Sequence, residues 1–195
     1  NIRGTMESLD KEAFSMAAEL IQNAKKIYIV GIRSCEPLAD FLGFYLNMLF
    51  DEVHVVRTNS ASEIFEQLMR IGAGDVLIGI SFPKYSMRTV KAMELANSRS
   101  AGVISITDSI HSPLNLYSSC NLIARSEMAS VVDSLTAPLS VINALIVALC
   151  LKNQDSLKQS IETLDQLYDD YQIYGRDEMD PSGGEIEIFH QGSRV

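Results

Sequence analysis

Cysteine and histidine are scarce in this sequence, which has three of each among 195 residues. The cysteines Cys35, Cys120 and Cys150 are odd in number, widely separated and without a CxxC pair, which excludes a disulfide framework and a cysteine-based zinc site. This pattern is typical of reduced thiols inside a cell. The histidines are scattered without metal-ligand spacing, and we expect neither a metal nor a cofactor.

Basic residues are also under-represented. Lysine and arginine number 16 against 25 aspartates and glutamates, for a formal net charge of -9. A body this acidic repels a phosphate backbone, so nucleic-acid binding by the chain itself is disfavoured. An anionic ligand would need a local positive pocket. Glycine (11) and proline (5) are few as well, while apolar residues make up 47%, the balance of an ordinary globular protein.

The sequence lacks a long uninterrupted apolar run. Residues 135–151, LTAPLSVINALIVALCL, come nearest, but they include Pro138, Ser140 and Asn143 and fall below the roughly 18 residues that indicate a transmembrane helix. We interpret them as a buried helix in the core or at a subunit interface, with no membrane as partner. No charged leader followed by an apolar core opens the sequence, and we expect a cytoplasmic protein.

Short β-branched runs alternate with amphipathic segments. The runs lie at 27–30, 53–56, 76–80, 103–106 and 121–124. Continuous apolar runs of this kind are typical of parallel strands covered on both faces. Helices are predicted between and around them, at 8–24, 36–50, 61–71, 87–97, 131–151 and 155–171. The series predicts a three-layer αβα sandwich around a five-stranded parallel sheet.

The composition changes beyond Gly175. Residues 176–180 are charged, residues 181–184 break regular structure, and residues 185–189 alternate like a short strand. We therefore predict a single domain over residues 1–174 and a C-terminal tail, 175–195, that is flexible or adds an edge element.

The loop after the first strand reads VGIRSCEP. Ligands of an open parallel sheet bind beyond the carboxyl ends of its strands, where the strand order changes direction. Gly31 allows a tight turn there, Ser34 suits a helix N-cap, and Pro37 suits a first helical turn. A helix start exposes N–H groups and partial positive charge that attract a phosphate. A Ser34 that only caps a helix is the alternative.

The loop after the third strand, ISFPKYSMRT, gathers hydroxyls and cations just ahead of a helix. Ser81, Lys84 and Ser86 suit a phosphorylated or polyhydroxylated ligand. A solvated loop in which Ser86 caps the helix is the alternative. After the fourth strand, Thr107 and Asp108 are predicted to face the same crevice.

Four segments together resemble a sugar isomerase (SIS) domain, and in particular the effector domain of the RpiR family of bacterial transcription regulators. They are KKIYIVGIRSC, VLIGISFPKYSMRTV, VISITDSIHSPL and SVVDSLTAPLSVINAL, in family order between about Ile21 and Leu151. The resemblance implies the flavodoxin-like SIS fold and a phosphorylated sugar or similar anionic metabolite as ligand. It also implies that Ser34, Ser81 and Ser86 contact the phosphate.

RpiR regulators carry an N-terminal helix-turn-helix domain before this region, and the chain has no such segment. The resemblance therefore implies an effector-binding half that reaches DNA only through that absent domain. The chain departs from the family pattern where Arg33 replaces a glycine of many SIS domains and Pro83-Lys84 replaces a small Ser-Gly pair. We predict that Arg33, Lys84 and Arg88 supply the positive charge that the acidic body lacks, with ordinary surface cations as the alternative.

Sugar-phosphate isomerases of this kind need a base that removes a proton next to the carbonyl. Glu127 and His111 are the nearest candidates, and the sequence pairs neither with a second acid or base. A ligand sensor is therefore the leading hypothesis, and an isomerase or lyase acting through Glu127 or His111 is the alternative. The apolar helix at 135–151 predicts a homodimer or higher homo-oligomer.

Overall fold

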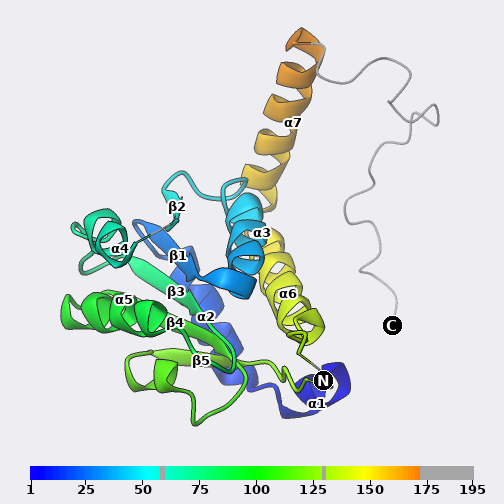
Figure 1. Ribbon diagram of the computed structural model, residues 1–195. Coiled ribbons are helices and arrows are strands. Elements are labelled where there is room, and N and C mark those ends of the chain that lie inside the picture. Colours follow the sequence, from blue (N-terminus) through cyan, green and yellow to red (C-terminus); the bar gives the residue numbers. More distant parts are fainter. Residues whose placement is uncertain (58–59, 129–130, 172–195) are drawn as a thin grey trace. The chain divides into compact units, whose positions relative to one another are not determined.

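The computed structural model describes residues 1–57, 60–128 and 131–171 (Figure 1). Five strands form one parallel sheet in the order β2-β1-β3-β4-β5. They are β1 (Ile27–Gly31), β2 (Val53–Val55), β3 (Val76–Ile80), β4 (Gly102–Thr107) and β5 (Cys120–Ile123). Each strand begins and ends within one residue of the run that predicted it, which confirms the five-stranded parallel sheet.

Helices precede, connect and follow the strands. They are α1 (Ile2–Ser8), α2 (Lys11–Gln22), α3 (Glu36–Leu46), α4 (Ala61–Gln67), α5 (Met87–Ser98), α6 (Thr136–Lys152) and α7 (Gln154–Tyr171), with two 3-10 turns, η1 (Arg33–Cys35) and η2 (Pro113–Leu116). The prediction of one helix over 8–24 was wrong at its start. Asp10 accepts the N–H groups of Glu12 and Ala13 at 2.9 and 3.0 Å and so begins α2, whereas Leu9 is extended and separates it from α1.

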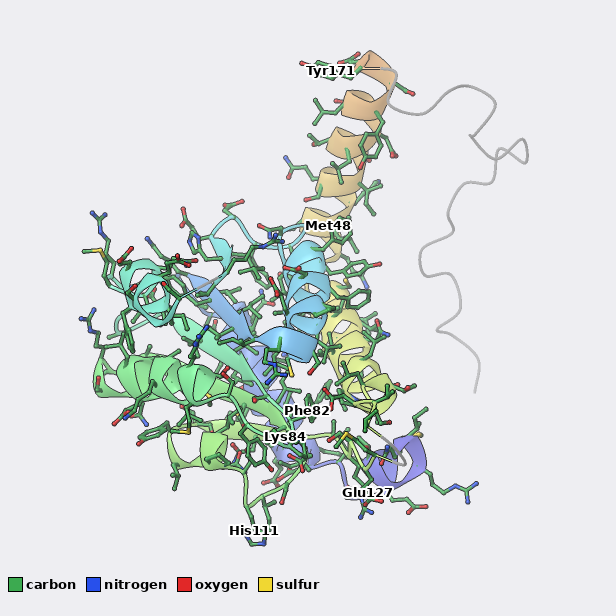
Figure 2. All side chains as sticks on the ribbon, viewed as in Figure 1. Met48, Phe82, Lys84, His111, Glu127 and Tyr171 are labelled. Atoms are coloured by element: carbon green, nitrogen blue, oxygen red, sulfur yellow. The ribbon has the colours of Figure 1, made fainter. Side chains whose placement is uncertain are left out.

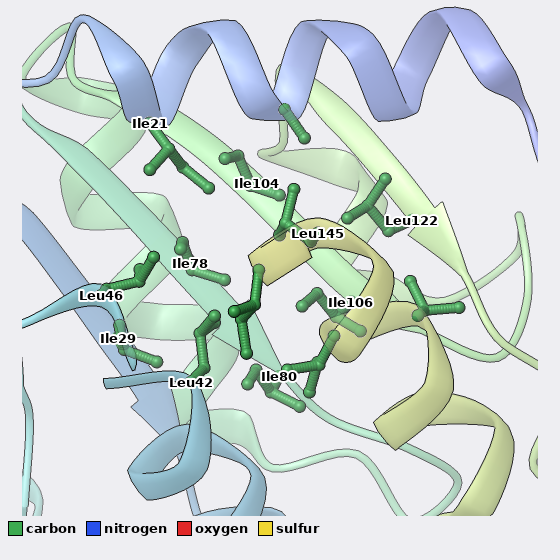
Figure 3. Packing of buried hydrophobic residues seen from close by; sticks show 14 of the residues in the cluster. Ile21, Ile29, Leu42, Leu46, Ile78, Ile80, Ile104, Ile106, Leu122 and Leu145 are labelled. Carbon is green, nitrogen blue, oxygen red and sulfur yellow. The ribbon is translucent and has the colours of Figure 1, made fainter. Parts of the chain in front are cut away.

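Strand residues alternate between two cores, one on each face of the sheet. Ile29, Ile78 and Ile104 point into the core covered by α2, α3 and α6 (Figure 3). Their neighbours Val30 and Leu77 point into the core covered by α4 and α5. Because β1 and β3 are buried on both faces, their sequences are apolar without alternation. The two cores confirm the three-layer αβα sandwich.

The apolar run at 135–151 forms α6, as predicted. Leu145 and its inward neighbours are buried against the sheet (Figure 3), while Val147 and Leu151 are 52% and 49% exposed. Within the described part of the chain, no single helix is long and apolar enough to cross a membrane. The pair α6 and α7 passes that test only when taken together, by length and composition.

The chain divides into two compact units, Asn1–Leu157 and a second that begins at Lys158. The first contains the sheet and α1 to α6. The described part of the second is the remainder of α7, where Lys158 and Glu162 form an ion pair at 3.8 Å. The predicted domain end at residue 174 and the predicted tail, 175–195, lie outside the described residues.

Candidate functional site

The loops after β1 and β3 leave the sheet at the point where its strand order reverses. β2 lies on one side of β1 and β3 on the other. α3 therefore packs on one face of the sheet and α5 on the opposite face. The carboxyl ends of β1 and β3 open between these helices, which is where open parallel sheets bind their ligands. The first two predicted ligand loops, residues 30–37 and 80–89, begin at this edge.

Gly31 ends β1 where there is no room for a side chain. A Cβ on Gly31 would lie 2.4 Å from the carbonyl oxygen of Cys35, because the chain turns at once toward α3. Pro37 occupies the first turn of α3, as predicted. The prediction that Ser34 caps this helix was wrong. Ser34 lies inside η1, which is inserted before α3, and Cys35 precedes α3 without any side-chain cap.

Arg33 and Lys84 both have a left-handed backbone, with φ of 60° and 67°. They stand at the two positions where the sequence pattern of many SIS domains has glycine, the residue that adopts this conformation without steric cost. Both side chains are exposed. The two loops therefore keep a glycine-like backbone while presenting a cation at the end of each strand.

The second loop is closed by its own serines. Ser81 is buried, and its Oγ accepts the Ser86 N–H at 3.0 Å. The Oγ of Ser86 accepts the Thr89 N–H at 3.4 Å, which makes Ser86 the N-cap of α5. The capping role considered for Ser86 is confirmed. Contact of Ser81 and Ser86 with a phosphate stays a prediction.

The first and second loops meet at Cys35. Burial raises the pKa of the Cys35 thiol, and hydrogen bonds from the Phe82 backbone and the Ser34 side chain act in the opposite direction. Phe82 is itself buried at the edge that also carries Lys84 (Figure 2). Cys35 and Phe82 also belong to the same buried cluster, so the turns after β1 and β3 lie close together.

The loop after β4 joins the second loop through Tyr85. Its hydroxyl donates to Asp108 Oδ1 at 2.9 Å. Burial, and then the Asp108 carboxylate, raise the pKa of Tyr85 to about 12, so the phenol remains a donor at neutral pH. Thr107 is fully buried, with its Oγ1 2.9 Å from Ser112 Oγ and 3.3 Å from Asp108 Oδ1. The Thr107 hydroxyl thus links Asp108 to Ser112 at the end of β4.

A cavity of about 500 Å³ adjoins the second and third loops. It is lined by Ser8, Pro83, Asp108, Ser109, Ile110, Ile123, Arg125, Ser126, Glu127 and Met128. Asp108 and Glu127 are the predicted site residues that the cavity brings together. His111 is not part of this lining, and it lies exposed on its loop, pointing away from Glu127 (Figure 2). The other predicted residues lie on the neighbouring loops.

Three consecutive residues after β5 form one wall of this cavity. Arg125 and Glu127 are exposed and form an ion pair at 3.7 Å. Ser126, between them, is buried, and its Oγ has no hydrogen-bond partner among the described residues. Sequence reasoning missed Ser126. The available signal was its position just beyond the end of a predicted strand, at the same edge as the other loops.

No cluster of three or more histidine, cysteine, aspartate or glutamate side chains that could hold a metal ion occurs among residues 1–57, 60–128 and 131–171. The predicted site residues at this edge contribute hydroxyls, cations and two carboxylates.

A model of SIS domains matches residues 20–148. The chain belongs to the SIS domain family. Among solved structures, this SIS domain resembles the sugar isomerase domain of an RpiR transcription factor from Sphaerobacter thermophilus, at 25% identity and a TM-score of 0.81 over 85% of this chain and 92% of that one. It shares its fold with the Vibrio vulnificus NanR protein complexed with ManNAc-6P, at 19% identity and a TM-score of 0.75 over 85% and 65% of the two chains.

Two curated relatives are uncharacterized HTH-type transcriptional regulators. The regulator of Caldanaerobacter subterraneus is 28% identical over 174 residues, and that of Haemophilus influenzae is 22% identical over 157 residues. The matches cover 85% and 78% of this SIS domain but 60% and 54% of the relatives. The chain thus spans just over half the length of these relatives. The resemblance to an SIS domain, and to those of RpiR regulators, is confirmed.

Proposed function

We propose that this SIS domain binds a phosphorylated sugar at the carboxyl edge of its sheet and acts as the effector-binding part of a transcription regulator. The observation that carries the proposal is the meeting of the loops after β1 and β3. Arg33 and Ser34 stand just before α3 on one loop, and Lys84 and Ser86 stand just before α5 on the other. Free N–H groups, hydroxyls and cations at a helix start favour a phosphate dianion.

The neighbouring cavity has room for the sugar. Its volume of about 500 Å³ lies within the usual range of small-molecule sites. Asp108 and Glu127 offer carboxylate oxygens that accept hydrogen bonds from hydroxyls. The complex of Vibrio vulnificus NanR with ManNAc-6P supports a sugar phosphate as the class of ligand.

The relatives support a regulatory role. Both are HTH-type regulators longer than this chain, so DNA contact belongs to a part of such a protein outside the SIS domain. The proposal includes a homodimer. α3 and α6 pack together and present apolar side chains outward, with Phe44 63% and Val147 52% exposed. Burying such residues against a second copy is favourable, and sedimentation of a strict monomer at micromolar concentration would contradict the dimer.

The binding proposal is tested by thermal shift with phosphorylated sugars, including N-acetylmannosamine 6-phosphate, beside the free sugars. A ligand at 100 times its Kd adds about 2.7 kcal/mol of stability. Ser86→Ala should abolish the shift. That substitution also removes a helix cap, worth about 1 kcal/mol. Asp10→Ala removes the cap of α2 at a similar cost and should leave the shift intact. Equal shifts in all three proteins, or stabilisation by free sugars alone, would contradict the proposal.

A further inference from the structure

Asn1 does not use its side chain to cap the helix that it precedes. Its Nδ2 donates to the Glu127 carbonyl at 2.8 Å, and its Oδ1 accepts the Glu127 N–H at 3.1 Å. Nδ2 also donates to Ser134 Oγ at 2.8 Å. An asparagine at a helix start ordinarily accepts an N–H of its own helix. Here the carboxamide instead forms hydrogen bonds with the loop after β5, more than a hundred residues along the chain.

Thr5 binds the same loop at Arg125, the residue before Ser126. Thr5 is buried, and its Oγ1 accepts the Arg125 N–H at 2.9 Å. Gly4 makes room for the Arg125 side chain, whose Cδ would lie 2.9 Å from a Cβ at residue 4. The N–H groups that flank Ser126 are therefore both bound to α1 or its cap residue. α1 also contacts α6 and lies beside its start (Figure 1).

Ser126 contributes to this wall of the cavity a hydroxyl without a hydrogen-bond partner among the described residues. Its hydroxyl is buried without a hydrogen bond in the described part of the chain, which is costly unless a ligand or water completes it. Ser126 and Ser8, the last residue of α1, both line the cavity. Pro83 from the loop after β3 and Asp108 from the loop after β4 also line it.

We infer that an uncharged hydrogen-bonding group of the sugar binds Ser126, and that this contact couples ligand binding to the docking of α1. The inference rests on the proposed function and adds a contact outside the phosphate loops. A ligand that bridges Ser126 and Asp108 stabilises the wall that α1 holds in place. By linkage, undocking α1 lowers the affinity for the ligand by the same factor by which bound ligand favours the docked position of α1.

The test compares Asn1→Ala and Ser126→Ala with Asp10→Ala, which removes the cap of α2 and touches none of these contacts. Each protein is titrated with N-acetylmannosamine 6-phosphate, or with the panel sugar phosphate that stabilises the unmodified chain most, and separately with inorganic phosphate. Asn1→Ala and Ser126→Ala should each raise the Kd for the sugar phosphate roughly five- to tenfold. The Kd for inorganic phosphate should stay unchanged. Asp10→Ala should change neither affinity.

Two further readouts separate coupling from a packing role. Amide exchange in residues 2–8 and 124–128 should slow when the sugar phosphate binds and stay unchanged with inorganic phosphate. Because Asn1 acts through Ser126, Asn1→Ala should have little additional effect in the Ser126→Ala background. Ser126→Ala should not lower the melting temperature of the free protein, since it removes an unpaired hydroxyl.

Sugar phosphate affinity that stays unchanged in Asn1→Ala and Ser126→Ala, with unaltered exchange in α1, would overturn this inference and leave the proposed function standing. Failure of every sugar phosphate to bind the unmodified chain would overturn the proposed function, and this inference with it.

Discussion

Replacing Lys84 by glycine should stabilise the protein and weaken its ligand at the same time. Lys84 holds φ at 67°, a left-handed conformation that costs an ordinary side chain about 1–2 kcal/mol. Glycine removes that cost but adds about 0.5–1 kcal/mol of unfolded-state entropy. The net expectation is a gain of about 0.5–1 kcal/mol, because the exposed Lys84 side chain forms no ion pair or hydrogen bond among the described residues. For a chain of this size, that raises Tm by about 1–4 °C.

The same substitution removes a cation from the proposed phosphate site. An exposed charge pair contributes up to about 1 kcal/mol, so the Kd for a sugar phosphate should rise about fivefold. The difference from the unmodified chain should shrink as salt is raised from 20 to 500 mM, because the Debye length falls from roughly 20 Å to about 4 Å.

Lys84→Gln is the matched control, since it removes the charge and keeps a side chain on the left-handed backbone. It should weaken the ligand as much as Lys84→Gly without the gain in Tm. Calorimetric titration and thermal unfolding of both variants complete the test. A Lys84→Gly protein less stable than Lys84→Gln would refute the backbone argument, and an unchanged Kd in both would refute the role of the cation.

Four other changes test separate parts of the structure. Gly31→Ala would place a Cβ against the Cys35 carbonyl oxygen and should cost about 2–3 kcal/mol in urea unfolding; a loss below about 0.5 kcal/mol would contradict the tight turn. Tyr85→Phe removes the hydrogen bond to Asp108 and should cost about 1 kcal/mol in the same assay, so a neutral result would mean that the loops are not joined there. Burial raises the pKa of the Cys120 thiol from 9.0 to about 11, so the unfolded chain loses this proton first. The unfolding free energy should therefore fall by up to about 2–3 kcal/mol between pH 9 and 11, and a Cys120→Ala protein with the same pH slope would rule this thiol out as the cause. Finally, turnover of aldose or ketose phosphates that disappears in Glu127→Gln would establish the isomerase alternative, whereas we expect none in either protein.

The sheet could be predicted from the sequence because strands that are buried on both faces consist of continuous runs of apolar residues. The resemblance to SIS domains also placed the first two loops at one edge, and the contact at Cys35 agrees with it. Local turns were harder to predict. Ser34 has the chemistry of a helix cap, but a 3-10 turn displaces the start of α3 beyond it. Asp10 divides the predicted N-terminal helix in two, because its side chain caps the start of α2.

Long-range polar contacts were beyond reach for a different reason. Ser126 has no neighbours in sequence that identify it as unpaired, since the cavity that it lines is formed with α1 and the loops after β3 and β4. Asn1 and Thr5 bind residues more than a hundred positions away, and hydrogen bonding of this kind leaves no periodicity to detect. His111 was a reasonable candidate by residue type, and only the path of its loop removes it from the cavity.

The hydrogen bond from the Ser86 N–H to Ser81 Oγ has a consequence for the speed of recognition. A loop that is already closed on itself has no conformational search left when a metabolite arrives. Association of inorganic phosphate, which does not reach Ser126 or α1, should then follow a single exponential in stopped-flow measurements, with a rate proportional to phosphate concentration and no plateau from a slow opening step. The lifetime of this complex would then be decided by the rate of dissociation alone.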